Sequence, residues 1–244
     1  MGDTLDRVFV NLYDQTDANN PDEVEVIEFG PDDYVIHPDY IPQTDENNPE
    51  NDIALILLPH EVENADTIQY PQLNEENDEP EGGDPLLVMG WGDTLENGDG
   101  SFSDVLLQAG VNYVTNQQCT SDYDYDPLEI TDDMMCAAAA GRDSCVGDSG
   151  GPLILNNGNR DPVLVGVVSF GPENCADPDY PGVGVYARVS HFAEIGLKRR
   201  HVMKLASFAP NHPLSPQLNQ VSRRQLNHLN RHPPSHRASQ ATLL

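Results

Sequence analysis

The fold is decided by one stretch of the chain, Gly141-Arg142-Asp143-Ser144-Cys145-Val146-Gly147-Asp148-Ser149-Gly150-Gly151-Pro152-Leu153. A serine hydroxyl acts as a nucleophile when a sharp turn exposes it and nearby backbone N–H groups can hold an oxyanion. Glycine permits such a turn and leaves the space around the N–H group of Gly147 open. The stretch therefore predicts a nucleophilic serine, Ser149, on a tight turn. The alternative is an ordinary glycine-rich β-turn without chemistry.

The sequence on both sides of this stretch indicates a protein built mainly of β-strands. Its apolar runs are short, rich in Val, Ile and Leu, and bounded by Gly, Pro, Asn and Asp. Such runs predict strands rather than helices. The expected strands lie within residues 8–13, 24–29, 34–37, 53–58, 86–90, 103–113, 153–155, 163–170 and 184–189.

The 244 residues are enough for two small barrels. We expect a first β-rich unit over residues 1–71 and a second over residues 85–197. Residues 72–84 between them are acidic and lack an apolar period, which is typical of a linker. Residues 198–244 are rich in His, Arg, Ser, Gln and Pro, so we expect a disordered tail there.

The charge of −29 divides unevenly along the chain. Residues 191–244 hold eight basic residues and one acidic residue, a net charge of +7. The first 190 residues hold the other 4 basic and 40 acidic residues, a net charge of −36, and contain no lysine. Because phosphate would be repelled, this acidic body is not expected to bind nucleic acid. Cationic peptides would be attracted to it.

The cysteines, Cys119, Cys136, Cys145 and Cys175, form no Cys-x-x-Cys pair, and the histidines are not spaced to complete a zinc site. We therefore expect two disulfides and no metal, although four cysteines alone leave the pairing open. Disulfides imply an oxidising compartment. The N-terminus shows no signal-peptide core, and no apolar run approaches membrane-spanning length.

Residues 141–153 resemble the active-site serine loop of the chymotrypsin family of serine proteases, in its trypsin branch. Other landmarks occur in the order of that family and extend the resemblance over most of residues 8–190. They are Asn51-Asp52-Ile53-Ala54-Leu55-Ile56, Met89-Gly90-Trp91-Gly92 and Ser169-Phe170-Gly171. The resemblance implies an all-β fold of two antiparallel Greek-key barrels and no cofactor.

The resemblance also implies roles for single residues in an acyl-enzyme mechanism. Ser149 would be the nucleophile, and the N–H groups of Gly147 and Ser149 would form the oxyanion hole. Asp52 would orient the catalytic histidine. Asp148 would pair with the amine that zymogen cleavage creates.

The specificity pocket follows from the same resemblance. Asp143 would lie at its base and bind Arg or Lys of a protein substrate. Ser169 and Gly171 would belong to the strand edge that aligns the substrate, and Gly182 would line the pocket. The segment around Gly182 is two residues longer than the family pattern, so Gly184 is the alternative.

The disulfides implied by the resemblance join Cys119 to Cys136 and Cys145 to Cys175. The resemblance further implies an extracellular monomer that cleaves peptides and binds protein protease inhibitors. The acidic loops, including residues 11–28, also allow a calcium hypothesis. Since they lack a defined array of ligands, we expect solvated charge there.

The catalytic histidine is the missing part. His37 is the single histidine before Asp52, and it lies in Val35-Ile36-His37-Pro38, which resembles a non-catalytic family segment. The sequence therefore predicts an incomplete first barrel and an inactive chain. The alternative is a non-catalytic homologue that serves as a binding module.

The basic tail is either sequence past a mispredicted exon boundary or a genuine segment that binds the acidic body or an anionic surface.

Overall fold

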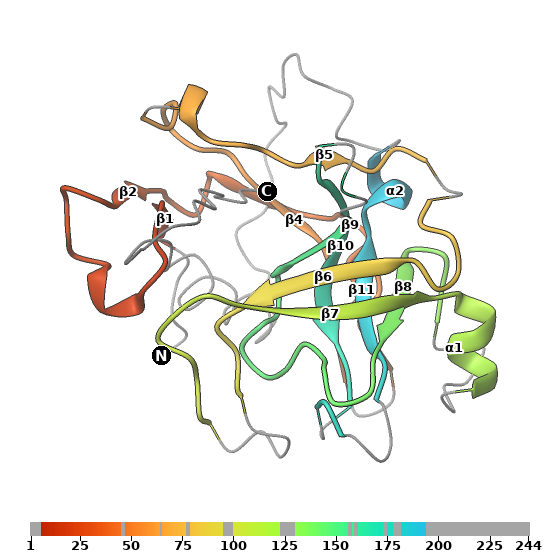
Figure 1. Ribbon diagram of the computed structural model, residues 1–244. Coiled ribbons are helices and arrows are strands. Elements are labelled where there is room, and N and C mark those ends of the chain that lie inside the picture. Colours follow the sequence, from red (N-terminus) through yellow and green to blue (C-terminus); the bar gives the residue numbers. More distant parts are fainter. Residues whose placement is uncertain are drawn as a thin grey trace.

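A closed barrel of six antiparallel strands forms the larger part of the computed structural model (Figure 1). Its order is β11-β8-β7-β6-β9-β10, and β10 pairs with β11 to close it. The strands are β6 (Pro85–Gly90), β7 (Leu107–Val114), β8 (Met134–Ala138), β9 (Pro152–Leu155), β10 (Val163–Phe170) and β11 (Gly184–Arg188). Since closure removes the free edges of the sheet, all six strands have paired backbones on both sides.

The structure describes residues 6–193, apart from 45–46, 64, 77–78, 95–99, 123–129, 156–157, 159–160, 173–174 and 178–181. The predicted tail over 198–244 lies outside these residues. None of the described helices is long and apolar enough to span a membrane.

The barrel interior is filled around Tyr186, whose side chain is fully buried. Gly166 on the neighbouring strand β10 makes room for it: a Cβ there would lie 3.1 Å from Tyr186 Cβ and 3.1 Å from Met135 Sδ. Buried aliphatic side chains from the other strands complete the core. They include Leu86, Val88, Val111, Leu153 and Val165.

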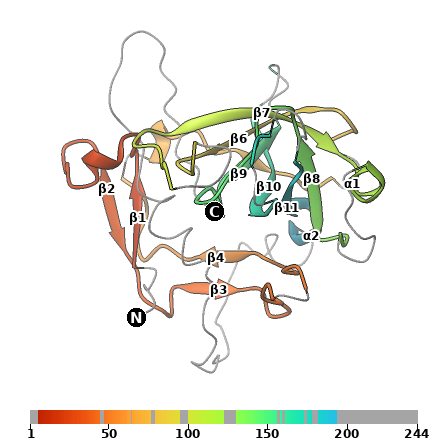
Figure 2. The ribbon, with the colours of Figure 1, turned by 90° about the horizontal axis from the view of Figure 1, so that it is seen from below.

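The first unit contains two separate two-stranded antiparallel sheets among the described residues (Figure 2). One pairs β1 (Arg7–Val10) with β2 (Glu25–Glu28), and the other pairs β3 (Tyr34–Ile36) with β4 (Ala54–Ile56). A small core of Val8, Val10, Ile27 and Phe29 lies between them, with half-buried neighbours such as Tyr34 and Ile56. Two short 3-10 helices, η1 (Gln15–Asp17) and η2 (Ala65–Thr67), belong to the loops of this unit.

The predicted linker over residues 72–84 begins with a strand. β5 (Gln72–Leu73) pairs in parallel with β10, and Asn74 donates its N–H group to the carbonyl of Leu164. The start of this segment is therefore packed against the barrel.

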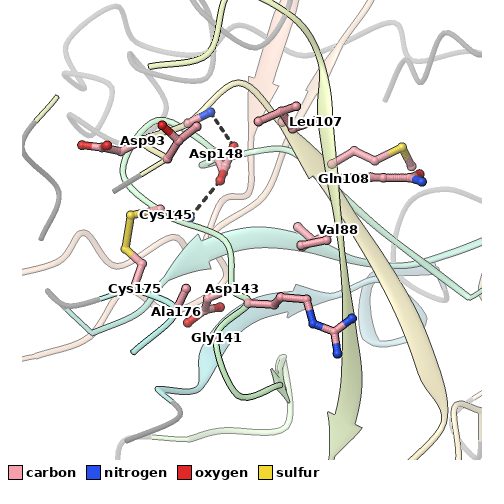
Figure 3. A pocket seen from close by; sticks show the side chains of 16 residues that line it. Val88, Asp93, Leu107, Gln108, Gly141, Asp143, Cys145, Asp148, Cys175 and Ala176 are labelled. Carbon is pink, nitrogen blue, oxygen red and sulfur yellow. Dashed lines mark hydrogen bonds between the residues drawn. A yellow bond between two sulfur atoms is a disulfide. The ribbon is translucent and has the colours of Figure 1, made fainter. Parts of the chain in front are cut away.

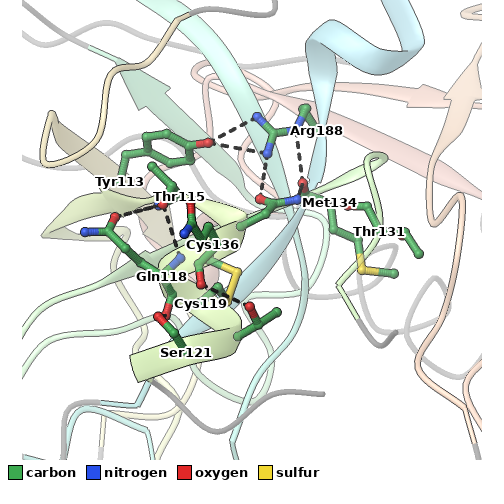
Figure 4. Close-up of a disulfide and its surroundings, with 12 residues drawn as sticks. Tyr113, Thr115, Gln118, Cys119, Ser121, Thr131, Met134, Cys136 and Arg188 are labelled. Atoms are coloured by element: carbon green, nitrogen blue, oxygen red, sulfur yellow. Dashed lines mark hydrogen bonds between the residues drawn. A yellow bond between two sulfur atoms is a disulfide. The ribbon is translucent and has the colours of Figure 1, made fainter. Parts of the chain in front are cut away.

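Two disulfides have the expected pairing. Cys119 lies on α1 (Asn116–Asp122) and is joined to Cys136 on β8 (Figure 4), whereas Cys145 is joined to Cys175. The remaining helix, α2 (Val189–Phe192), follows β11 directly.

Candidate active site

Asp52 is buried where the first unit meets the barrel. The hydroxyl of Ser169, near the end of β10, donates a hydrogen bond of 2.7 Å to Asp52 Oδ2. Its other oxygen, Oδ1, is also buried and has no hydrogen-bond partner among the described residues. Burial raises the pKa of Asp52, the Ser169 hydroxyl partly offsets this, and the charge of Asp133 raises it further. One carboxylate oxygen is therefore held, and the other is left for an additional donor.

Ser149 lies on a tight turn that glycine makes possible. The φ angles are 97° at Gly147 and 78° at Gly150, in the left-handed region that favours glycine. A Cβ at Gly147 would lie 2.7 Å from the ring of Phe102, so a larger residue would also be excluded by contact. Within the described part of the chain, no backbone oxygen accepts the N–H of Gly147 or Ser149.

Neighbouring residues of β10 connect this turn with Asp52. The carbonyl of Val168 accepts the N–H of Gly150 at 2.8 Å, and Val168 N–H donates to the carbonyl of Gly151 at 2.9 Å. The next residue, Ser169, holds Asp52. One strand therefore fixes the serine turn and the aspartate at the same place in the fold.

Asp148 points away from solvent, against the start of the loop after β6. Its Oδ1 accepts the N–H of Gly92 at 2.7 Å, and its Oδ2 accepts the N–H of Cys145 at 2.8 Å (Figure 3). A Cβ at Gly90 or Gly92 would lie 2.0 or 2.5 Å from this carboxylate, so both positions require glycine. Burial raises the pKa of Asp148 to about 6, although the two hydrogen bonds oppose the shift.

A cavity of about 340 Å³ opens beside Asp148. Figure 3 shows that β6 and β7 form one wall, with Val88, Leu107 and Gln108, and that the loop carrying Asp143 forms another. Both carboxylates therefore border one cavity, in which a cation would lower the cost of burying their charge.

Asp143 has one satisfied and one unsatisfied oxygen. Its Oδ1 accepts the N–H of Ser144 at 2.8 Å, whereas Oδ2 is buried and lacks a hydrogen-bond partner in the described residues. Burial raises the pKa of Asp143 to about 7. The hydrogen bonds from Ser144 lower this pKa, and the negative charge of Asp148 raises it. A buried carboxylate of this kind favours a cationic ligand.

The glycine beside Asp143 is Gly184. A Cβ there would lie 2.9 Å from Asp143 Oδ1 and 2.9 Å from Tyr186 Oη, and a Cβ at Gly171 would lie 3.7 Å from Gly184 Cα. Gly184, the alternative to Gly182, therefore lies beside the Asp143 carboxylate. The role of Gly182 stays a prediction. Tyr186 Oη also lies 3.2 Å from Ser144 Oγ.

The comparisons with known proteins agree with this arrangement. A family model described as trypsin matches residues 7–195. The chain belongs to the trypsin family. The closed barrel and a trypsin-like structural neighbour confirm the predicted all-β trypsin fold.

Curated trypsin-family relatives match one stretch of the chain. Trypsin delta of Drosophila erecta is 43% identical over 141 residues, which are 57% of this chain and 51% of the relative. Hypodermin-A of Hypoderma lineatum is 41% identical over 159 residues, 65% of this chain and 56% of the relative. The chain therefore spans about half the length of the curated relatives it matches.

A solved structure gives the same fold. Neuropsin, described as a serine protease expressed in the limbic system of mouse brain, aligns with a TM-score of 0.66 and 26% sequence identity. The alignment covers 82% of this chain and 81% of neuropsin.

The three histidines among the described residues are engaged away from Asp52 Oδ1. His37 Nδ1 accepts the N–H of Asp39, and its ring lies edge-on to Phe192 at 5.4 Å. His60 Nδ1 lies 3.1 Å from the carbonyl of Glu61, and the His191 ring lies 5.1 Å from that of Phe192. His37 therefore packs against Phe192, and its Nε2 is buried without a hydrogen-bond partner among the described residues.

Sequence reasoning missed the residues that make room for the site or support it. Gly90 and Gly92 belong to a segment that resembles the family, and their close approach to Asp148 is a separate reason for glycine at both positions. The sequence gives no sign of the role of Asp133, because one more acidic residue in an acidic body carries no local signal. Its contact with the segment before Asp52 is visible only in the folded chain.

Proposed function

We propose that the whole protein is a trypsin-like serine endopeptidase that hydrolyses proteins after Arg or Lys. The observation that carries this proposal is the buried, unsatisfied Oδ2 of Asp143, whose other oxygen, Oδ1, lies beside Gly184. A guanidinium or ammonium group would supply both the missing donor and the opposite charge. Ser149 follows six positions later on the same loop.

The proposed chemistry is acyl transfer. Ser149 Oγ attacks the scissile carbonyl and gives its proton to a histidine, while the N–H groups of Gly147 and Ser149 hold the oxyanion. The histidine then protonates the leaving amine, and water hydrolyses the acyl-enzyme by the reverse proton transfers. Asp52 Oδ1 would accept the histidine N–H, which is the contact that Ser169 leaves open.

Asp148 is proposed to control the geometry of the oxyanion hole. It directly precedes Ser149, and its carboxylate borders the cavity described above. An N-terminal amine entering that cavity would favour the ionised carboxylate and fix the turn that carries Gly147. The space made by Gly90 and Gly92 is consistent with this role.

We propose that the chain of 244 residues does not hydrolyse peptides by itself. The proposal is supported by the sequence, in which His37 lies in a segment that resembles a non-catalytic part of the family, and by the contacts of His37, His60 and His191 given above, none of which involves Ser149. Without such a base, a serine hydroxyl is a poor nucleophile.

The same observation favours a second candidate, a non-catalytic homologue that binds cationic peptides through the Asp143 subsite. The two candidates differ in turnover, whereas they share the subsite. A binding measurement therefore tests the subsite, and a hydrolysis measurement on a chain extended at its N-terminus to include an upstream histidine tests the enzyme.

The test uses fluorescence of p-aminobenzamidine, an aromatic amidinium, with the 244-residue chain. We expect saturable binding that Asp143→Asn abolishes and that Ser149→Ala leaves unchanged. Equal binding to the Asp143→Asn variant would contradict the specificity proposal. Hydrolysis of an arginyl chromogenic substrate by a longer product containing a histidine upstream of residue 7, lost in Ser149→Ala, would support the enzyme over the binding module.

The two disulfides and the trypsin family are consistent with secretion, and we propose an extracellular monomer that meets protein protease inhibitors. We also propose that the unit boundaries lie at residues 71 and 85.

Turnover measured in the 244-residue chain and lost in Ser149→Ala would refute the view that its base is absent.

A further inference from the structure

Asp133 lies directly before β8, on the barrel side of the junction with the first unit. Its side chain is buried, with 7% of its surface exposed. Oδ2 accepts the N–H of Asn51 at 2.7 Å, and Oδ1 accepts the hydroxyl of Thr131. The carbonyl of Asp133 accepts the N–H of Arg188 at 2.7 Å, so the residue is anchored to β11 through its backbone.

The partner of Asp133 is the residue that precedes Asp52. Asn51 has a φ of 50°, in the left-handed region that residues other than glycine rarely adopt. Its side chain donates to the carbonyl of Asp39 at 3.1 Å, and its own carbonyl accepts the N–H of Ile53 at 2.8 Å. The Asp133 carboxylate therefore fixes the N–H group of a strained turn that directs Asp52 into the barrel.

The charge of Asp133 also reaches Asp52. Burial raises the pKa of the Asp52 carboxyl, and the negative charge of Asp133 raises it further, whereas the Ser169 hydroxyl lowers it. The nearby cation does not neutralise Asp133. The Arg188 guanidinium instead donates to the carbonyl of Met134 at 3.0 Å, to Asn116 Oδ1 at 2.8 Å and to Tyr113 Oη (Figure 4).

We infer that Asp133 is a positioning residue for the proposed triad aspartate. The barrel holds Asp52 at two points, with Ser169 on its carboxylate and Asp133 on the backbone directly before it. The inference rests on the proposed function, because Asp52 matters to catalysis only if the site is that of a serine protease. Through these two contacts, the second unit sets the geometry of a residue that the first unit supplies.

The experiment uses the full chain and needs no turnover. The carboxyl carbon of Asp52, assigned with Asp52→Asn, is titrated by NMR in the native protein, in Asp133→Asn and in Asp132→Asn. The last is a matched control, because Asp132 carries the same charge one position earlier but is exposed. Amide hydrogen exchange at Asn51 is measured in the same proteins and in Asp133→Ala.

We expect Asp133→Asn to lower the pKa of Asp52, because a like charge is removed, and Asp132→Asn to leave it close to the native value. Protection of the Asn51 amide should fall about tenfold in Asp133→Ala, the equivalent of one hydrogen bond, and should be retained in Asp133→Asn, whose amide oxygen can still accept. A purely structural role would not move the Asp52 titration.

An unchanged Asp52 titration in Asp133→Asn, or an Asn51 amide as protected in Asp133→Ala as in the native chain, would overturn the inference. If Asp133→Ala does not fold, Asp133→Ser, whose shorter side chain cannot reach the Asn51 amide, takes its place in the exchange measurement. These readouts are independent of p-aminobenzamidine binding and of hydrolysis. Failure of the positioning role and failure of the proposed function can therefore be told apart.

Discussion

The hydroxyl of Ser169 donates to Oδ2 of Asp52 at 2.7 Å, across 117 positions of sequence. The contact joins β10 of the closed barrel to the segment before β4 of the first unit. It occupies one oxygen of the carboxylate, and the other is buried without a hydrogen-bond partner among the described residues. The geometry of the proposed triad therefore depends on both units.

Replacing Ser169 by alanine is expected to destabilise the protein at neutral pH by about 1.5 to 3 kcal/mol, the usual value of a hydrogen bond to a charged group. The pKa of Asp52 should rise, because the contact that favours its ionised form is lost. Urea denaturation at neutral and acid pH measures both effects.

The destabilisation should shrink in acid, where Asp52 is protonated in both proteins. Ser101→Ala, at an exposed position, is the control and should leave stability unchanged. A loss of stability in Ser169→Ala that is equal at both pH values would show that the hydroxyl acts in packing alone.

Adding a methyl group at Gly184 is expected to block the cationic subsite. The new Cβ would lie 2.9 Å from both Asp143 Oδ1 and Tyr186 Oη. Affinity for p-aminobenzamidine should fall at least about tenfold, since a charged contact made in a buried place is worth more than 1.4 kcal/mol.

Gly30→Ala is the matched control for Gly184→Ala. A Cβ at Gly30 would meet only Asp33 Oδ2, at an ordinary contact distance of 3.6 Å. It should fold and bind the amidinium like the native chain. Unchanged affinity in Gly184→Ala would place the ligand somewhere other than beside Asp143.

The strands that the sequence predicted are those whose side chains carry β-propensity. Residues 163–170, rich in valine, became β10, and residues 53–58 contain β4. The strand β8 was not predicted, because its sequence of Met and Ala has little β-propensity. All five of its residues are buried, and β8 pairs with both β7 and β11. Burial and pairing therefore stabilise a strand that the local sequence does not favour.

In the site, too, a local motif could be predicted from the sequence, whereas contacts between residues far apart in the chain could not. A compact motif around Ser149 identifies the serine turn, since glycine spacing is a local property. The place of Gly184 beside Asp143 could not be predicted from a segment two residues longer than the family pattern, because it depends on how Tyr186 and Asp143 pack. Asp133 and Asn51 meet across 82 positions, so no local pattern announces their contact.

The two carboxylates of the cavity should make stability fall as pH rises from about 4 to about 7. Burial raises the pKa of Asp143 to about 7 and that of Asp148 to about 6, whereas the ordinary value is 3.8. In this range the folded chain binds more protons than the unfolded chain, so raising the pH favours unfolding.

Asp143→Asn removes one of these groups, and the fall in stability should be smaller in that variant. The unfolding free energy, measured in urea at a series of pH values, gives the slope for each protein. Asp32→Asn, at an exposed position, controls for the large negative charge of the whole body. Identical slopes in the native chain and Asp143→Asn would mean that Asp143 ionises normally.

The two disulfides should have different consequences when each is removed by paired replacement with serine. Their cysteines are separated by 17 positions in Cys119–Cys136 and by 30 in Cys145–Cys175. Loop entropy alone predicts a loss of about 3 to 4 kcal/mol for either bond. Only Cys145 and Cys175 border the cavity with Asp143 and Asp148, and Cys145 N–H also donates to Asp148.

Removing the Cys145–Cys175 bond should therefore lower both the stability of the protein and its affinity for p-aminobenzamidine. Removing the Cys119–Cys136 bond should lower stability and leave the affinity of the folded fraction unchanged. Urea denaturation and fluorescence titration on the same preparations separate the two effects, and each titration is corrected for the folded fraction. Since the bonds have similar entropic value, the Cys119–Cys136 variant serves as the matched control. Equal loss of affinity in both variants would mean that binding reports the general stability of the barrel rather than the cavity wall.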